Sequence, residues 1–321
     1  MVHRDHLGRV IARPSGNTIF TLPPKAPACP GLKLTSYDTI LVSISGGKDS
    51  QAALHTTVKA AEKAGVLDRV ETVFADLGKA DEWPGTRELA TDHAAAYGLP
   101  HHVVHREVTD ADGNPWQQGL LEYIGSRWQQ KWPLPNQPYC RSEMKRDPIA
   151  KLKTQIAADH RAAGITDRPA RILEVMGIRA QESAPRSKQK PFSTRGADSN
   201  SRRHVDVWLP IHHLTEEQTW AVVDEAGTRW HWIYLFLSRL SCRFCIVAPR
   251  EQLIQAARLD PQGARQRARL AERMGHDFKH ELNLWDVIAE AEALGPVDTS
   301  RLTPAALAEL EIMQAAAGVP R

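Results

Sequence analysis

The fold is decided by residues 39–56, which read TILVSISGGKDSQAALHT. The first six are largely apolar and β-branched, which is typical of a buried strand. Residues 51–64 contain strong helix formers and are followed by Gly65, a common residue just past the end of a helix. The sequence therefore predicts a strand, a tight turn at Ser45–Ser50 and a helix in direct succession.

Further strands and helices alternate along the chain. Strands are predicted at 70–74, 102–105, 171–176 and 205–211, and helices at 88–97, 116–132, 147–163, 216–226 and 250–274. Alternation of this kind is typical of an α/β fold, with a doubly wound, mostly parallel sheet of five or six strands. We expect three regions: a Pro-rich N-terminal arm at 1–37, the α/β domain at 38–248 and a helical C-terminal extension at 249–321.

Composition excludes several classes of protein. The chain has 321 residues, of which 42% are hydrophobic and 25% charged, as in an ordinary globular protein. Its apolar runs fall far short of the roughly 20 residues of a membrane span, and the first residues lack a signal-peptide core. We therefore expect a cytoplasmic protein. Four cysteines are too few for a disulfide scaffold.

The turn between the first strand and helix has the features of a phosphate site. Two glycines allow a close backbone approach, and the N–H groups at the start of a helix attract anions. Its candidate ligands are Ser45, Gly46, Gly47, Lys48 and Ser50, while Asp49 can hold Mg²⁺ or cap the helix. The alternative is a plain glycine-rich turn whose serine caps the helix.

The cysteines form a second group of candidates. Cys242 and Cys245 are spaced as CxxC, which suits an iron–sulfur cluster, a zinc ion or a redox dithiol. Cys140 precedes Lys145 and Arg146, whose charges are expected to lower the pKa of its thiol. The alternative is that these thiols are small buried apolar groups.

The 45–50 loop matches the SGGxDS loop of the N-type ATP pyrophosphatases, or PP-loop superfamily. Segments 73–86, 140–146, 177–183 and 208–220 resemble, in this order, the phosphoadenosine phosphosulfate (PAPS) reductase branch of that superfamily. The resemblance covers about residues 38–248. It implies an adenine nucleotide alpha hydrolase-like fold whose loop binds the phosphates of ATP, with Mg²⁺, or of a sulfonucleotide.

The resemblance also implies roles for single residues. Asp76 and Gly78 would lie near the ribose and adenine, and Gly177 and Arg179 near the phosphates. The implied catalytic residues are Lys48, Asp49, Lys145 and Arg179. From the residues alone, Asp76 is equally a strand-end cap, and Lys145 and Arg179 are equally surface charges.

Three cysteines match the ligands of the [4Fe–4S] cluster found in iron–sulfur members of the branch: Cys140, Cys242 and Cys245. The position before Cys140 holds Tyr139 instead of a fourth cysteine. Either Cys29 is the fourth ligand, or one iron is open, an arrangement that resembles tRNA-thiolating PP-loop enzymes. Zn²⁺ remains the alternative metal.

The chain departs from true sulfonucleotide reductases because no cysteine follows Cys245 to act as the C-terminal nucleophile. It is most similar to the PP-loop subunit of DNA phosphorothioation systems. The implied activity is ATP-dependent sulfur transfer: adenylation of a substrate oxygen with release of pyrophosphate, followed by attack of sulfur. DNA is favoured over tRNA as substrate, and a cysteine desulfurase or free sulfide would donate the sulfur.

Other functions stay open. They are a sulfonucleotide (PAPS) reductase, a PP-loop ligase that uses ammonia and zinc, and a non-catalytic nucleotide-binding subunit of a DNA modification or defence complex. Residues 183–204, expected as a mobile loop, hold six Lys or Arg and one acidic residue. They are either a phosphate-binding surface or a solvated face. The expected assembly is a homodimer or a multi-subunit modification complex.

Overall fold

The computed structural model describes residues 3–4, 10–12, 29, 31–127 and 132–316. Much of the predicted Pro-rich arm lies outside the described residues, apart from the short antiparallel strands β1 (His3–Arg4) and β2 (Val10–Ala12). The chain forms two compact units. The first runs to Ala75 and adds Arg87–Val104 and Pro148–His231; the second comprises Asp76–Thr86, His105–Asp147 and the chain from Trp232 onward.

A six-stranded sheet forms the centre of the first unit, with strand order β5-β4-β3-β8-β10-β9. Its strands are β3 (Thr39–Ser43), β4 (Val70–Asp76), β5 (His101–His105), β8 (Ala170–Met176), β9 (Phe192–Thr194) and β10 (Arg203–Trp208). β3 runs parallel to β4 and β8, β8 runs parallel to β10, and β9 is antiparallel to β10. The predicted doubly wound, mostly parallel sheet is confirmed, with six strands.

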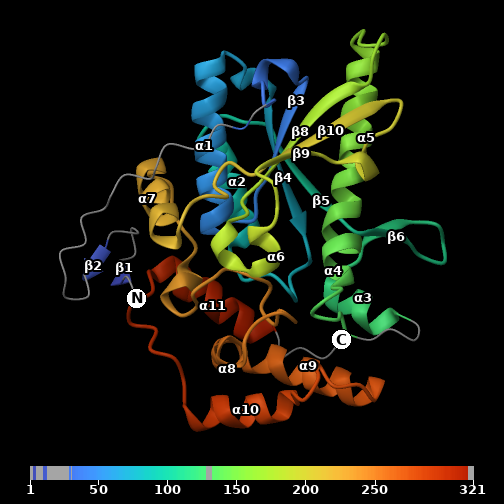
Figure 1. Ribbon diagram of the computed structural model, residues 1–321. Helices are drawn as coiled ribbons and strands as arrows, with labels where there is room; N and C mark the ends of the chain where they lie inside the picture. The colour runs from blue at the N-terminus through green and yellow to red at the C-terminus, as the bar shows by residue number, and fades with distance from the viewer. Residues whose placement is uncertain (1–2, 5–9, 13–28, 30, 128–131, 317–321) are drawn as a thin grey trace. The chain divides into compact units, whose positions relative to one another are not determined.

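Helices cover both faces of this sheet (Figure 1). α1 (Lys48–Ala64) and α2 (Thr86–Ala95) pack on one face and α5 (Asp147–Ala162) on the other. α7 (Glu216–Ala226) packs against α1, and the short α6 (Ala184–Ser187) lies in the segment between β8 and β9. Ile40 and Val42 of β3 pack in a core with Leu54 of α1, whereas Leu41 packs in another core with Ile156 of α5. Successive side chains of a strand point to opposite faces, which explains why the run is continuously apolar.

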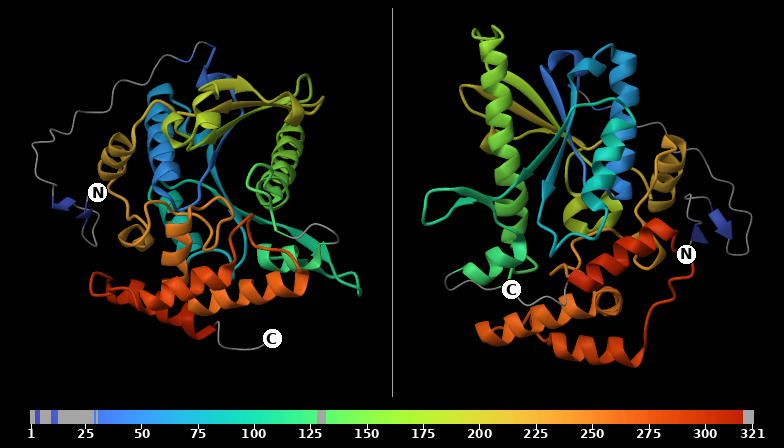
Figure 2. Two further views of the ribbon diagram at one scale, coloured as in Figure 1. Left: turned by 60° about the horizontal axis from the view of Figure 1, so that its bottom comes forward. Right: turned by 180° about the vertical axis from the view of Figure 1, so that it is seen from behind.

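The second unit contains most of the C-terminal helices (Figure 2). They are α8 (Arg250–Leu259), α9 (Pro261–Met274), α10 (Leu284–Ala293) and α11 (Pro304–Ala316). α10 packs on α8 and α9, which confirms a helical C-terminal region. The unit also holds the β6–β7 hairpin (Glu107–Thr109 and Pro115–Gln117), α3 (Leu120–Ser126), α4 (Tyr139–Arg141) and the π-helical turn η3 (Ser142–Arg146). Short 3-10 turns complete the described elements: η1 (Leu34–Ser36), η2 (Leu67–Arg69), η4 (Ala180–Glu182), η5 (Gly196–Asp198) and η6 (Trp232–Leu235).

Three local predictions are wrong. The described part of the helix predicted at 116–132 is the end of a hairpin strand, which finishes at Gln117, followed by the shorter α3. The extended backbone of Gly119 provides the N-cap of α3, and residues 128–131 lie outside the described residues. The helix predicted at 250–274 breaks at Asp260, which accepts a hydrogen bond from the backbone N–H of Gly263 and starts α9. The 183–204 segment contains α6, β9 and η5 rather than a loop alone.

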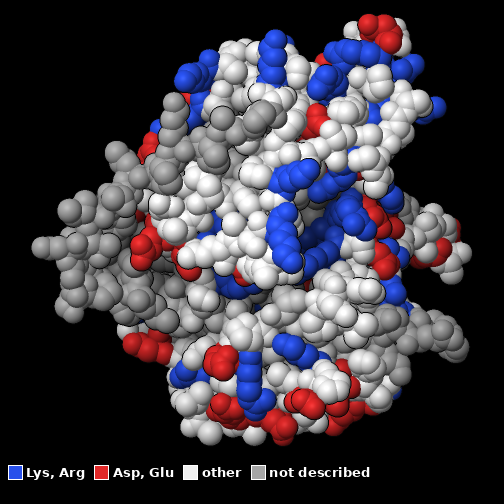
Figure 3. Space-filling model, in the orientation of Figure 1, with Lys and Arg blue, Asp and Glu red and all other residues white. Residues whose placement is uncertain are grey.

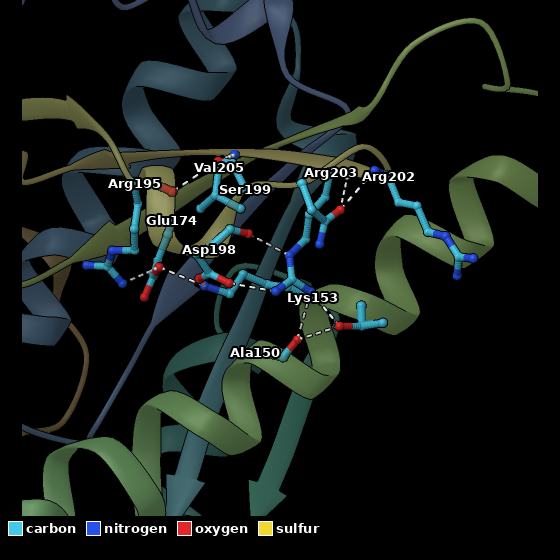
Figure 4. A network of polar contacts seen from close by, with 11 residues as sticks. Ala150, Lys153, Glu174, Arg195, Asp198, Ser199, Arg202, Arg203 and Val205 are labelled. Carbon is cyan, nitrogen blue, oxygen red and sulfur yellow. Dashed lines mark hydrogen bonds and ion pairs between the residues drawn. The ribbon is translucent and has the colours of Figure 1, made fainter.

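A buried network of charges holds α5 to the sheet in the first unit (Figure 4). The fully buried Lys153 of α5 lies with its Nζ 3.0 Å from Oε2 of Glu174 in β8, and it also pairs with Asp198 of η5. Arg195 pairs with Glu174 at 2.8 Å and Arg203 with Asp198 at 2.7 Å. Each buried carboxylate therefore faces two cations, which offsets the cost of removing these charges from water.

No helix among the described residues is long and apolar enough to cross a membrane.

Candidate nucleotide site and cysteine cluster

The predicted phosphate loop connects β3 to α1 in the first unit. Gly46 has a φ of +70°, a conformation that glycine adopts without strain. The Oγ of Ser50 accepts a hydrogen bond from the backbone N–H of Ser45 at 3.0 Å and donates to the carbonyl of Gly47 at 2.9 Å. Ser45 Oγ lies 3.2 Å from Ser50 Oγ. Ser50, in the first turn of α1, thus closes the turn at Ser45–Gly47. α1 itself begins directly after Gly47, at Lys48.

The end of β8 touches this turn through a glycine. A Cβ atom on Gly177 would lie 2.4 Å from the carbonyl oxygen of Asp49 and 2.8 Å from the backbone nitrogen of Ser50. No side chain fits at that distance from backbone atoms. Gly177 therefore allows the chain after β8 to reach the first turn of α1, as the sequence predicted for the ends of neighbouring parallel strands.

Arg179 follows Gly177 and points at the loop. Its side chain is buried, and its Nε lies 2.5 Å from Oδ1 of Asp49. Its NH1 group donates to Oε1 of Gln181 at 3.0 Å, and its backbone N–H donates to Glu182 at 2.9 Å. The structure thus brings together four residues that the sequence singled out: Lys48, Asp49, Gly177 and Arg179.

Lys48 is the second cation of the loop, and its side chain is also buried. Its Nζ lies 3.3 Å from Oε1 of Glu216 and 3.7 Å from Oδ2 of Asp49. The Trp220 ring centroid is 5.9 Å away, within cation–π range. The sequence analysis missed Glu216, Trp220 and Gln181 as members of this site. Two signals were available: the resemblance of segments 177–183 and 208–220 to the family, and the capping box at Thr215–Gln218, which places Glu216 in the first turn of α7.

Asp76 and Gly78 lie at the end of β4, in the residues that belong to the second unit. Oδ1 of the buried Asp76 accepts the backbone N–H of Gly78 at 2.8 Å, so this carboxylate does cap the end of the strand. Gly78 has a φ of +92°, and a Cβ there would meet the Cα of Gly119 at 3.0 Å. A contact of either residue with ribose or adenine stays a prediction.

The thiols of Cys140, Cys242 and Cys245 interact in the second unit. The Cys242 thiol hydrogen-bonds to the Cys245 sulfur, which lowers the pKa of Cys245 and raises that of Cys242. Burial, together with the nearby Cys245, raises the pKa of Cys140 to about 11. The prediction that neighbouring cations lower the pKa of Cys140 is therefore wrong, because burial outweighs the charges of Lys145 and Arg141.

Lys145 lies on η3, a π-helical turn of the kind often found at functional sites. Its charge favours the ionised forms of Cys140, Cys242, Cys245 and Glu82. Burial, with Asp76 and Asp81 adding to it, raises the pKa of the Glu82 carboxyl to about 7. Lys145 therefore interacts both with the thiols and with a titratable carboxyl, and nothing in the sequence marked Glu82 as such a group.

Buried ion pairs fix the CxxC loop within the second unit. Arg243, between the two cysteines, pairs with Asp260 at 2.6 Å, and its backbone N–H donates to the carbonyl of Asp81 at 2.8 Å. The Asp81 carboxylate accepts from Arg267 of α9 at 2.8 Å and from the backbone N–H of Leu121 at 2.8 Å. The start of α9 and the segment after β4 therefore position the two thiols.

Cys29 belongs to the first unit, whereas the other three cysteines belong to the second. It lines a cavity of about 130 Å³ with Leu32, Pro191, Trp208, Leu209, Pro210 and His213. Burial raises the pKa of its thiol, although a hydrogen bond with Trp208 opposes this. Cys29 as a cluster ligand stays a prediction.

We asked whether the cysteines fit a metal or an iron–sulfur cluster. Thiolates are the right chemistry for iron and zinc. Within residues 31–127 and 132–316 and the shorter described pieces, however, no three Cys, His, Asp or Glu side chains are arranged to hold a metal ion. The three thiols have the right donor chemistry for a cluster, but the described side chains do not form a complete set of metal ligands.

Basic side chains gather on the face of the molecule around α6 (Figure 3). Lys188 and Lys190 are exposed there, and Arg186 is half-buried beside Glu182, with which it pairs. Part of the basic character predicted for residues 183–204 is therefore on the surface. The rest is internal, because Arg203 and Arg195 belong to the network of Figure 4.

Comparison with solved structures finds distant similarities. The chain is similar to the PAPS reductase of Candida auris, solved as a phosphate complex, with 14% identity, a TM-score of 0.37, and coverage of 63% of this chain and 79% of that one. It is similar to the FMN adenylyltransferase of Candida glabrata, solved with FMN and the ATP analogue AMPCPP, with 14% identity and a TM-score of 0.35. That match covers 58% of this chain and only 48% of the other. A search of curated proteins finds no match.

A family model gives the stronger assignment. The model described as the phosphoadenosine phosphosulfate reductase domain matches residues 39–236, which is more than half of the chain. The match begins at β3, includes the loop, Gly177, Arg179 and α7, and ends before the CxxC pair. The chain therefore belongs to the phosphoadenosine phosphosulfate reductase domain family.

Proposed function

We propose that the protein binds ATP on the 45–50 loop and uses it to activate an oxygen of a nucleic acid for replacement by sulfur. One observation carries the proposal: Lys48, Arg179 and the N-terminus of α1 converge at the carboxyl ends of β3 and β8. Backbone N–H groups at a helix start, with two buried cations, form a site suited to a polyphosphate.

The first chemical step would be adenylation. An oxygen of the substrate attacks the α-phosphorus of ATP, the bond to the bridging oxygen breaks, and pyrophosphate leaves. Lys48 and Arg179 would stabilise the negative charge that develops on the phosphates. Mg²⁺ would accompany ATP and neutralise part of its charge, and Asp49 is the carboxylate of the loop that is available to it.

The second step would be attack by sulfur. Sulfide attacks the activated phosphorus or carbon, and AMP departs with the oxygen. Where a cysteine desulfurase is the source, its persulfide must first be cleaved by a dithiol reductant, which is oxidised to its disulfide while the outer sulfur is released as sulfide and the cysteine returns to the thiol. The thiols of Cys140, Cys242 and Cys245 are the candidates to bind sulfur or a [4Fe–4S] cluster, with Zn²⁺ as the alternative metal. A DNA phosphodiester is favoured over a tRNA base as acceptor, and a multi-subunit modification complex is the expected setting.

A sulfonucleotide reductase is less favoured. That reaction needs a cysteine nucleophile as thiolate, and Cys29 is the only cysteine outside the CxxC and Cys140 group. Burial raises the pKa of the Cys29 thiol, which disfavours the thiolate.

Two measurements test the proposal. The first follows pyrophosphate and AMP release from ATP, with DNA and sulfide present or omitted. We expect release with wild type and none with Lys48→Met, and absence of release under every condition would favour a nucleotide-binding subunit.

The second measurement counts iron, zinc and acid-labile sulfide after anaerobic purification of wild type and Cys29→Ala. Iron and sulfide near four each, as a [4Fe–4S] cluster requires, would support the cluster; zinc or no metal would remove it from the proposal.

A further inference from the structure

The cation of the phosphate loop already has an anionic partner. Lys48 Nζ lies 3.3 Å from Oε1 of Glu216, and the Lys48 side chain is 3% exposed while that of Glu216 is 49% exposed. The Lys48 ammonium therefore sits inside the protein, and the carboxylate reaches it from the solvent side. A carboxylate and a phosphate oxygen make the same charge-assisted hydrogen bond to an ammonium group.

The secondary structure fixes Glu216 in this place. Glu216 is the first residue of α7, after Thr215, whose hydroxyl accepts the backbone N–H of Gln218. The Glu216 backbone N–H donates to Oε1 of Gln181 at 2.8 Å, and the same oxygen accepts from Arg179. Trp220 lies one turn further along α7 and also faces Lys48. One helix thus presents both the carboxylate and the aromatic ring to the loop lysine.

Arg179, the second cation beside the loop, is paired as well, because its Nε lies 2.5 Å from Oδ1 of Asp49. The two carboxylates differ in origin. Asp49 belongs to the loop itself, while Glu216 comes from a helix more than 160 residues away in the chain. A phosphate that binds Lys48 must either replace the Glu216 carboxylate or lie beside it. If it lies beside the carboxylate, the two negative charges repel each other.

We infer that, before a nucleotide binds, the Glu216 carboxylate pairs with Lys48 at the position that a phosphate oxygen would take. Bound nucleotide displaces this carboxylate, so Glu216 sets the affinity for phosphoryl ligands. This inference rests on the proposed use of the loop for ATP. Removing the charge of Glu216 takes one anionic partner away from Lys48 and removes the repulsion between Glu216 and the phosphate. Because the pair is half-exposed, the expected gain in affinity is modest, about three- to tenfold.

The test compares Glu216→Gln with Glu217→Gln by calorimetric titration at 0.15 M salt with EDTA. Glu217 is its exposed neighbour, and among the described residues no ion pair joins it to Lys48. Both variants lose one negative charge at the start of α7. ATP, inorganic pyrophosphate and adenosine are the three probes. We expect Glu216→Gln to bind ATP and pyrophosphate about three- to tenfold more tightly than wild type and adenosine equally well.

Three results would overturn the inference: no gain in Glu216→Gln, an equal gain in Glu217→Gln, or a gain for adenosine that matches the gain for ATP. If wild type and both variants bind pyrophosphate but not ATP, the proposed function is refuted, and the pyrophosphate affinities still decide the role of Glu216. If no protein binds either anion, both fail. Thermal unfolding of each variant shows whether α7 is intact, and a variant that unfolds early is replaced by Glu216→Ala for the same comparison.

Discussion

The Nε of Arg179 lies 2.5 Å from Oδ1 of Asp49, which joins the end of β8 to the first turn of α1. Both side chains face the loop, and Arg179 is buried. The pair holds the guanidinium beside the helix N-terminus. A nucleotide phosphate would meet a cation that is already oriented, which reduces the entropy cost of binding.

We expect Arg179→Ala to weaken ATP binding by about ten- to a hundredfold, because a charge-assisted contact with the phosphates is lost and Asp49 loses its shortest ion pair. Titration with ATP measures the effect. Arg168→Ala is the control, since Arg168 pairs with Asp38 at the surface of the same unit. An unchanged affinity in Arg179→Ala would exclude a phosphate contact.

Gly177→Ala tests the close approach of β8 to the loop. The added Cβ would meet backbone atoms of Asp49 and Ser50 at 2.4–2.8 Å, so the loop must move. We expect a loss of about 1–3 kcal/mol in the free energy of unfolding and weaker ATP binding. Urea denaturation measures the stability. Gly196→Ala is the matched control, because a Cβ there meets nothing within 4 Å, and an equal loss in both would contradict the steric argument.

The raised pKa of Glu82 predicts a pH-dependent stability. A free Glu has a pKa of about 4.3, whereas in the folded protein that of Glu82 is about 7. Between these values the native state binds the proton more tightly, so the contribution of this group to stability falls as the pH rises. Glu82→Gln should therefore raise the free energy of unfolding by about 1–3 kcal/mol at pH 8 and have little effect at pH 4.

Thermal unfolding at the two pH values checks this prediction. The exposed Glu107 of the β6–β7 hairpin offers a control, and Glu107→Gln should shift the melting temperature little at either pH. Equal stabilisation by Glu82→Gln at pH 4 and pH 8 would show that packing, rather than titration, is responsible.

Lys153 is the centre of the network in Figure 4, between Glu174 and Asp198. Lys153→Ala removes a buried cation and leaves a cavity, and we expect it to cost about 3–5 kcal/mol of stability. Lys151→Ala, exposed on the same helix, should cost almost nothing. Denaturation in urea compares them, and similar midpoints would mean that Arg195 and Arg203 suffice to neutralise the two carboxylates.

The sequence predicted local features well because they depend on neighbouring residues. The strand, the glycine turn and the helix at 39–64 follow from composition within one short segment. Gly177 and Arg179 were accessible through the resemblance of residues 177–183 to a family motif, and for Arg179 the meeting of parallel strand ends at one edge of a sheet gave the same indication.

Long-range pairings were not predictable in this way. Glu216 reaches Lys48, and Asp81 reaches both Arg243 and Arg267, across large separations in sequence that no spacing rule covers. The pKa of Cys140 was mispredicted for a related reason. Its adjacent cations are visible in the sequence, while the burial that outweighs them depends on the tertiary packing of the second unit.

Asp260 combines a local role, as the N-cap of α9, with a long-range role, as the partner of Arg243. Oδ1 caps α9 through the Gly263 N–H at 2.8 Å, and Oδ2 pairs with Arg243 of the CxxC loop at 2.6 Å. Asn retains the capping oxygen and loses the charge, whereas Ala loses both. We expect Asp260→Ala to destabilise the protein by about 3–5 kcal/mol, because it leaves Arg243 buried and short of its partner.

Asp260→Asn separates the two roles. It should cost less in urea denaturation than Asp260→Ala by about 1 kcal/mol, the usual value of an N-cap. Both variants should increase the rate at which a thiol reagent modifies Cys242 and Cys245 in the native protein, since the loop between them is released. Faster modification in Asp260→Ala alone would mean that the cap, and not the ion pair with Arg243, positions the two thiols.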